Sequence, residues 1–417
     1  MPAKSLDAGV LRTAAPPQPK GPEPLQTPSI EGVALPLRRL YAWPMSGSMS
    51  TRAVVALEAL EHLATQDLST QETCEQVVDR ITRAIEVDSF FAAATDPDTG
   101  LCLGAGMSYS MDSSVCHPFW EHEFLVPDFN KFADLAVGDP VADLRAATGG
   151  KLSRSPRYRV LNALSDLEDE LRAVLHAGGR SWGNLQLNRF TGSKPFSAED
   201  VEFLRAAAPL AGAALRRALL EEPAETDPRR GPGVVVLDEE GTILSATGEA
   251  DAWLDELAAG WRRDDINLLM HPELMRMSLS TLSEQEAAGR RVRLRTRSGV
   301  WLVAHASPLG DSGNVALVIE PAKASEVAPI VVKAYGLTPR EVEVTRLVSR
   351  GLSTDEIATT LFLSRHTIRD HLRAIFEKVG VSSRGELTSR LFAEHYHPQL
   401  DEAVALSHER VQARAEA

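Results

Sequence analysis

Four sets of helix start and stop signals follow one another closely between residues 337 and 396. In the first set, Thr338 is a predicted N-cap, Pro339 occupies the first helical position and Glu341 completes a capping box. This helix is expected to end at Gly351, which suits a left-handed C′ position. Because start and stop signals at such short intervals permit only short helices, this segment constrains the fold more than any other.

Three further helices are predicted after the first. Ser353 and Glu356 form a second capping box. Ser364 caps a third helix that ends before Gly380, and Ser383 opens a fourth. Only a few residues separate the second and third helices, so these two helices are expected to pack at a steep angle. That arrangement is a helix-turn-helix.

The third predicted helix has two different faces. Its apolar side chains recur at helical spacing and predict a buried stripe, made of Ile368, Leu372, Ile375, Phe376 and Val379. Beside the stripe, Arg365, Arg369 and Arg373 recur every fourth residue. A row of guanidinium groups fits the major groove of DNA, where Arg binds guanine O6 and N7 or holds phosphates. The alternative is a solvated face on which Asp370 and Glu377 pair with the arginines, but the capped helix before it favours DNA.

This segment resembles the helix-turn-helix of the LuxR/GerE (also NarL/FixJ-like) family of bacterial transcription regulators. The resemblance covers residues 337–396 and rests on the runs Leu337-Thr338-Pro339-Arg340-Glu341, Gly351-Leu352-Ser353 and Lys378-Val379-Gly380. It implies that residues 364–378 form the recognition helix and that the fourth helix carries a dimer contact. A homodimer would then bind double-stranded promoter DNA with half-sites about one helical turn apart. The DNA-binding residues expected on this basis are Ser364, Arg365, His366, Thr367, Arg369, Asp370, Arg373 and Lys378.

Asp370 departs from the neutral or basic residue that is common at its position in this family. Its carboxylate either accepts a hydrogen bond from cytosine N4 or pairs with Arg373. The formal net charge of the chain is −14, which is unusual for a DNA-binding protein. The third helix, however, carries four basic residues against two acidic ones. The acidity therefore belongs to the rest of the chain, and a local basic footprint is retained.

Three cysteines at wide spacing, Cys74, Cys102 and Cys116, form no CxxC motif and no disulfide framework. Their odd number is typical of a reducing compartment. The sequence shows no apolar run of the ~18 residues that a membrane span needs, and no signal peptide pattern. We therefore expect a cytoplasmic protein without a membrane partner.

Residues 51–222 are expected to form a sensor domain. The predicted helices and strands span 51–61, 75–85, 90–94, 101–106, 170–177, 182–187 and 197–220, and the region from 108 to 159 is expected to be irregular. This order resembles a GAF domain, most specifically in the run Trp182-Gly183-x-Leu185-x-Leu187-x-Arg189. Asn188, Arg189, Phe196 and Asp200 fall near the pattern of cyclic-nucleotide GAF domains, although Val201 replaces an acid there. The same residues serve fold stability in GAF domains generally.

The long helix predicted at 197–220 is expected to contribute a second dimer contact. Its apolar residues give it more hydrophobic surface than one domain may bury, as Leu204, Leu210, Leu215 and Leu219 illustrate. The alternative is that all of this surface packs on the sheet of its own domain.

The irregular region contains a candidate ligand pocket, formed by Cys116, His117, Trp120 and His122. A thiol and two imidazoles so close together are also compatible with a metal or haem site. No second pair of ligands with a matching spacing accompanies them, so the sequence favours a pocket wall or a structural loop and predicts no metal site. The cofactor, if any, is unknown.

The remaining segments are assigned by composition and order. Residues 1–50 are Pro-rich and are expected to form a disordered tail, of which residues 1–44 are expected to be dispensable. Residues 233–322 read as two strands, helices and three strands, and loosely resemble a PAS domain, in which His271 and His305 are either haem ligands or structural histidines. The other predicted segments are a linker at 223–232, a connecting helix at 323–336 and a C-terminal tail at 397–417.

The predicted fold is therefore multidomain α+β, with GAF-like and PAS-like α/β sensor domains followed by an all-α four-helix DNA-binding domain. The predicted function is that of a one-component, signal-responsive transcription regulator that is not an enzyme, since no catalytic motif is present. RNA polymerase and an unknown small-molecule ligand are further candidate partners. The alternatives are a sigma-factor-like promoter-recognition protein, a sensor enzyme, and a GAF sensor scaffold without direct DNA readout.

Overall fold

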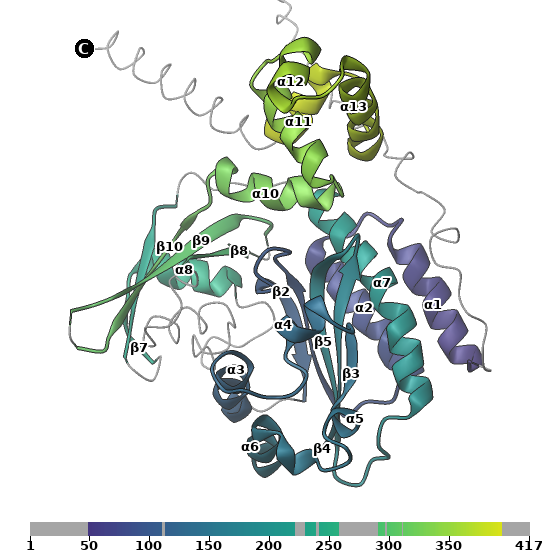
Figure 1. The fold of residues 1–417 in the computed structure, drawn as a ribbon. Coiled ribbons are helices and arrows are strands. Elements are labelled where there is room, and N and C mark those ends of the chain that lie inside the picture. The colour runs from purple at the N-terminus through teal and green to yellow at the C-terminus, as the bar shows by residue number, and fades with distance from the viewer. Residues whose placement is uncertain are drawn as a thin grey trace, which may run out of the picture.

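The computed structural model describes residues 49–110, 113–221, 230–238, 242–257, 291–296, 298–310 and 312–393. These residues form two units, each built on a five-stranded antiparallel sheet, and a C-terminal group of helices (Figure 1). This confirms the α+β class with a helical C-terminal part. The predicted C-terminal tail, nearly all of the N-terminal tail, most of the linker, and His271 lie outside the described residues.

The sheet of the first unit has the strand order β2-β1-β5-β4-β3. Helices α1, α2 and α7 pack on one face of it, while α3, α4 and α6 pack on the other (Figure 1). The elements are α1 Thr51–Leu63, α2 Thr70–Ala84, β1 Ser89–Thr95, β2 Cys102–Tyr109, α3 Cys116–Phe124, α4 Phe132–Val137, β3 Val141–Asp143, α5 Leu144–Ala147, α6 Pro156–Ser165, β4 Leu167–Ala177, β5 Arg180–Phe190 and α7 Ala198–Glu221.

The prediction of an irregular region from 108 to 159 was wrong, because this region holds four helices and the edge strand β3. These elements are 3 to 10 residues long, so most contain too few residues to show a helical or alternating period. Side-chain caps define two of their starts. Asp143 accepts from the N–H groups of Arg145 and Ala146, and Ser155 accepts from the N–H of Tyr158.

The expectation that α7 exposes more apolar surface than its own domain can bury was also wrong. Leu204 and Leu215 are 0% exposed, and Leu210 and Leu219 are 3% and 5% exposed. They pack into the core that α7 shares with α1, α2 and the sheet. The apolar face of α7 is therefore buried within its own chain. Without an exposed apolar face, α7 gives no support to a dimer contact there.

The sheet of the second unit has the order β7-β6-β10-β9-β8, and helix α8 packs on it through the fully buried Trp253. Its described elements follow the predicted order, while the PAS-like assignment itself stays a prediction. His305 lies 3.2 Å from Glu320 on the neighbouring strand, which favours a structural histidine. The elements are β6 Gly233–Leu237, β7 Ile243–Ala246, α8 Gly248–Leu257, β8 Arg291–Arg295, β9 Trp301–Pro308 and β10 Val315–Pro321.

The connecting helix α10 (Ala324–Ala334) lies between the two sheet units and the C-terminal helices (Figure 1). The C-terminal helices are α11 Pro339–Ser349, α12 Thr354–Leu361, α13 Arg365–Val379 and α14 Arg384–Thr388, followed by a π-helical turn at Ser389–Ala393. In the described part of the chain, no helix is both long enough and apolar enough to cross a membrane.

Candidate nucleic-acid interface

The four predicted helix starts are present as hydrogen bonds. The Thr338 N–H donates to the Glu341 carboxylate at 2.6 Å, and the Thr338 hydroxyl accepts from the N–H of Glu341. Ser353 repeats this capping box at the start of α12. Ser364 and Ser383 accept from backbone N–H groups at the starts of α13 and α14. These caps fix the length and direction of each helix by satisfying N–H groups that have no partner inside the helix.

A two-residue connection joins α12 to the cap of α13. Phe362 ends α12 with left-handed backbone angles of φ 55° and ψ 43°, and the N–H of Leu363 donates to the carbonyl of Ala358 at 2.9 Å. The turn holds both helices on one apolar core, made of Val344, Val348, Ile357, Ala358, Ile368, Leu372, Ile375, Val379, Leu387 and Leu391. The predicted apolar stripe of α13 faces this core, so the arginine row lies outside it.

Arg369 and Arg373 lie one helical turn apart on the exposed side of α13. Among the described residues, neither side chain forms a hydrogen bond or an ion pair. Both guanidinium groups therefore keep all five N–H donors available for an external acceptor. This is the arrangement that the sequence predicted for a base-reading or phosphate-binding face.

The other charged residues predicted for this face have partners. Arg365 Nε lies 2.5 Å from Asp355 Oδ1 on α12, in a pair whose side chains are both more than half exposed. Asp370 lies 3.7 Å from the His366 imidazole and, among the described residues, forms no ion pair with Arg373, the partner that one alternative gave it. Because these pairs are exposed, water or phosphate can compete for their members at little cost.

Lys378, another residue predicted for DNA binding, has an acidic partner on helix α11. Its ammonium lies 2.7 Å from Glu341 Oε2, and the Glu341 carboxylate also accepts from the Thr338 N–H. Burial raises the pKa of Glu341, but these hydrogen bonds outweigh burial and hold the pKa below its ordinary value. Lys378 therefore ties the end of α13 to the start of α11 through its ammonium.

The start of α13 presents two hydroxyl groups. The Ser364 hydroxyl accepts from the Thr367 N–H at 3.1 Å, and the two side-chain oxygens lie 2.8 Å apart. Both residues stand at the N-terminus of a 15-residue helix, where the helix dipole favours an anion. Ser364 and Thr367 therefore lie at a helix terminus, where the helix dipole favours a bound anion.

Comparison with known proteins identifies the C-terminal helices. The model of the family described as bacterial regulatory proteins, luxR family, matches residues 336–391. The spore germination protein GerE of Bacillus subtilis is 40% identical over 55 residues, which are 13% of this chain and 74% of GerE. The chain belongs to the LuxR family.

Other relatives also match over short stretches of this chain. A Mycobacterium bovis protein named as an HTH-type transcriptional regulator is 49% identical over 51 residues, which are 12% of this chain and 6% of that protein. The chain thus spans only a small part of the curated relatives that match it first. Among solved structures, SdiA in complex with octanoyl-rac-glycerol aligns with 84% of this chain and 97% of its own, at a TM-score of 0.30 and 10% identity. That score is too low to establish a shared fold.

Two arginines that the sequence analysis missed brace the LuxR-type module. Arg340 Nη2 donates to the Leu361 carbonyl at the end of α12. Arg384 donates to the Leu352 carbonyl at 2.7 Å and to the Thr354 hydroxyl at 2.9 Å, just before and at the start of α12. Both therefore hold α12 from its two ends. Their position near helix termini is the only sequence signal that could have identified this role.

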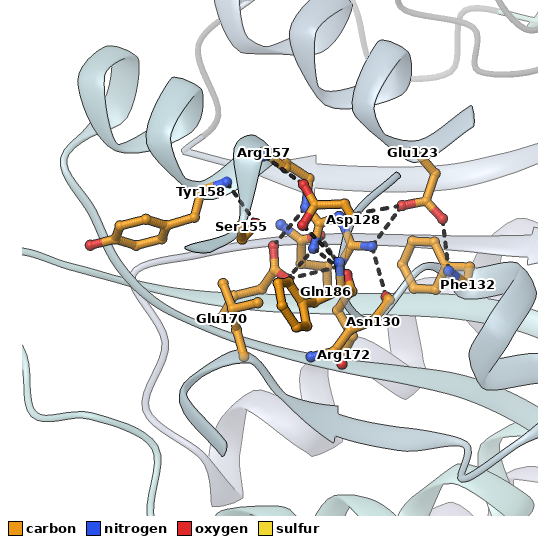
Figure 2. Close-up of polar contacts among 12 residues, drawn as sticks. Glu123, Asp128, Asn130, Phe132, Ser155, Arg157, Tyr158, Glu170, Arg172 and Gln186 are labelled. Carbon is orange, nitrogen blue, oxygen red and sulfur yellow. Dashed lines mark hydrogen bonds and ion pairs between the residues drawn. The ribbon is translucent and has the colours of Figure 1, made fainter. Parts of the chain in front are cut away.

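The first unit contains a buried charge network, whose member Glu123 directly follows the predicted pocket residue His122 in the sequence (Figure 2). Arg172 Nη1 lies 2.7 Å from Glu123 Oε2, and Arg172 Nε lies 3.1 Å from Glu170 Oε1. Arg157 Nη2 lies 2.7 Å from the same Glu170 oxygen. Glu123 belongs to α3, Arg157 to α6, and Arg172 and Glu170 to β4. No sequence pattern predicts this network, because its members are separated along the chain and show no common spacing.

The network is balanced in charge but has hydrogen-bond donors in excess. All four side chains are at most 5% exposed. Burial lowers the pKa of Arg172, whereas burial at Glu170 is outweighed by the two arginines, which hold its pKa below the ordinary value. Among the described residues, Arg172 Nη2, Arg157 Nη1 and the Asn130 side-chain amide have no hydrogen-bond partner. A neutral oxygen acceptor would satisfy these donors without unbalancing the charges.

The residues predicted for a ligand pocket differ in their burial and contacts. Trp120 is 5% exposed and packs edge-on against Phe119 at 4.6 Å, so it is a core residue. His122 is half-buried, and burial lowers its pKa. The side chains of Cys116 and His117 lie outside the described residues. No three His, Cys, Asp or Glu side chains in the described ranges gather closely enough to hold a metal ion.

The residues weighed for cyclic-nucleotide binding all have partners within the first unit. Arg189 donates to the carbonyls of Lys194 and Pro195, both at 2.8 Å, and its guanidinium lies 4.2 Å from the Phe196 ring. The Asn188 amide donates to the Ser89 hydroxyl at 2.9 Å. These contacts favour the interpretation that the motif stabilises the fold.

Proposed function

We propose that this protein is a one-component transcription regulator that binds promoter DNA through the outer face of α13. The observation that supports this most directly is the pair Arg369 and Arg373, exposed and without partners in the described chain on a helix whose other face is fixed in the module core. In this proposal one arginine reads a base edge and the other holds a phosphate. Ser364 and Thr367 add phosphate contacts at the helix start.

Twofold DNA recognition is proposed to require a homodimer. With α7 buried in its own chain, its apolar face no longer supports a dimer contact there. By family resemblance, the segment after Ser383 remains the candidate contact. RNA polymerase stays a further candidate partner.

The two sheet units are proposed to form the signal-responsive part, with a GAF-like domain at 51–222 and a PAS-like domain at 233–322. The donors of Arg172, Arg157 and Asn130 that form no hydrogen bond among the described residues support a site for a neutral, oxygen-bearing small molecule in the first unit. A ligand could regulate DNA binding only by binding more tightly to one arrangement of the protein than to another.

Selection from a random DNA pool tests the DNA-binding part of this proposal. The full chain should enrich a site with two related half-sites centred about 10 base pairs apart. Its affinity for the selected site should fall steeply with salt, as expected for several phosphate contacts. Failure to enrich any sequence above the starting pool would reject the proposed function.

A further inference from the structure

Helix α10 has two apolar sides that pack on different parts of the molecule. Val327, Ile330 and Ala334 are at most 3% exposed and belong to the core of the first unit. Val331 and Tyr335 pack against the core of the LuxR-type module. Because one rigid helix contributes to both cores, a movement of α10 relative to the first unit would also move the DNA-binding module.

The Tyr335 end of this helix is tied to the module by its last turn. The Tyr335 hydroxyl accepts from Arg390 Nε at 3.4 Å, and the π-helical turn that carries Arg390 packs on α10. Gly336, with a φ of 69°, then turns the chain directly into the cap of α11. No flexible linker therefore separates α10 from the DNA-binding helices.

Four charged residues from three parts of the chain meet around α10. Asp96 and Asp98 follow strand β1 of the first unit, Arg293 lies on β8 of the second unit, and Lys333 lies on α10. Arg293 Nη2 lies 2.7 Å from Asp96 and 3.2 Å from Asp98, and Arg293 Nη1 donates to the Glu326 carbonyl of α10 at 3.1 Å. Lys333 pairs with the second oxygen of Asp98.

We propose that Asp96, Asp98, Arg293 and Lys333 form an inter-unit latch that positions the DNA-binding module relative to the sensor units. This inference rests on the proposed function, because it names how the two halves are coupled. Asp98 bridges Arg293 and Lys333, so one acidic turn of the first unit holds both the second unit and α10. Lys333 and Arg293 are positioning residues, which act on DNA only through α10.

Two charged residues of the latch, Asp96 and Lys333, are largely removed from water. Asp96 is 2% exposed, and burial raises its pKa against the opposing effects of Arg293 and Lys333. Burial likewise lowers the pKa of Lys333. Desolvation thus offsets much of the attraction between these charges. Because the β1–β2 turn carries both aspartates, a shift of this turn would change the contact with α10.

The latch can be tested on the full chain with Lys333→Met, which keeps most of the apolar length of the side chain and removes the charged ammonium. The conservative variant Lys333→Arg should retain the contact. Asp139→Asn is the matched control, since Asp139 pairs with Arg205 within the first unit and away from α10. Hydrogen exchange of α10 amides should rise in Lys333→Met, with wild-type protection in Lys333→Arg and in the control. Unchanged α10 exchange in Lys333→Met would overturn the latch.

DNA binding provides the functional readout. A module held in place should favour a site with two half-sites over a single half-site, because its orientation is set before binding. In Lys333→Met this preference should fall by about threefold or more, while affinity for the single half-site stays at the wild-type level. An unchanged or increased preference would overturn the positioning role. If the wild-type chain binds no DNA at all, the proposed function fails, and hydrogen exchange still decides whether the latch exists.

Discussion

At the scale of single residues, the turn between α12 and α13 carries an unusual side chain. Phe362 adopts a left-handed backbone conformation that Gly and Asn adopt more readily, and its side chain is 94% exposed. Phe362→Asn removes little buried surface and relieves backbone strain. We expect this change to stabilise the module by about 1 kcal/mol. Greater hydrogen-exchange protection of α12 and α13 would confirm this, and reduced protection would show that the phenyl ring makes a stabilising contact.

The pair formed by Glu341 and Lys378 predicts acid sensitivity of the same module. The folded-state pKa of Glu341 lies below its ordinary value of 4.5. Its ionised form therefore contributes stability above about pH 4.5, and this contribution is lost as pH falls through the lower folded pKa. Lys378→Met should cost about 1.5–3 kcal/mol at pH 7 and reduce this acid dependence.

Protection factors for α11 and α13 amides at pH 7 and pH 4 measure this effect in the full chain. Arg346 lies on the same helix α11 and is exposed, so Arg346→Met offers a matched loss of one positive charge. The interpretation is wrong if Lys378→Met and Arg346→Met change the protection equally. Specificity for DNA should be the same in Lys378→Met as in the wild type.

Local signals predicted the starts of the helices in this module, whereas contacts between distant residues were not predicted. The caps at Thr338, Ser353 and Ser364 depend on residues three positions away, so the sequence contains all the information needed. Helical position alone groups Lys378 with the DNA-facing residues, because its partner Glu341 lies on another helix. Burial and partnership across elements are tertiary properties that helical spacing does not reveal.

At the scale of elements, α7 approaches strand β4 more closely than any side chain would permit. A Cβ atom added at Gly212 would lie 2.6 Å from the carbonyl oxygen of His176. Gly212→Ala must therefore shift α7 or β4, at a cost of about 1–3 kcal/mol. Hydrogen exchange should rise in α7 and β4, whereas the DNA-binding helices should be unaffected. Wild-type protection in Gly212→Ala would contradict this close packing.

The long elements were predictable and the short ones were not. Helix α7 has 24 residues and strands β4 and β5 have 11 residues each, which is enough to display their periods. Helices α4 and α5 have six and four residues, so no period could be seen. Amphipathicity also showed that α7 has an apolar face without showing which element would cover it.

At the scale of the whole molecule, the sequence predicts three parts of the chain but not how they are joined. The resemblance that identified the DNA-binding module is local, whereas the latch brings together residues as far apart as Asp98 and Lys333. The buried network of Arg157, Glu170, Arg172 and Glu123 was missed for the same reason. Coupling between the parts is thus a property of the assembled fold.

The central claim, that the outer face of α13 binds DNA, is tested most directly by Arg369→Ala and Arg373→Ala, with Arg346→Ala as an exposed control on α11. Affinity for the selected site and for scrambled DNA is measured at several salt concentrations. Losing a base contact should cost ~1–3 kcal/mol at the selected site only. Losing a phosphate contact should weaken binding to both DNAs and reduce the salt slope by about one. We predict that both variants bind the selected site more weakly than Arg346→Ala does, and wild-type affinity in both would contradict the account.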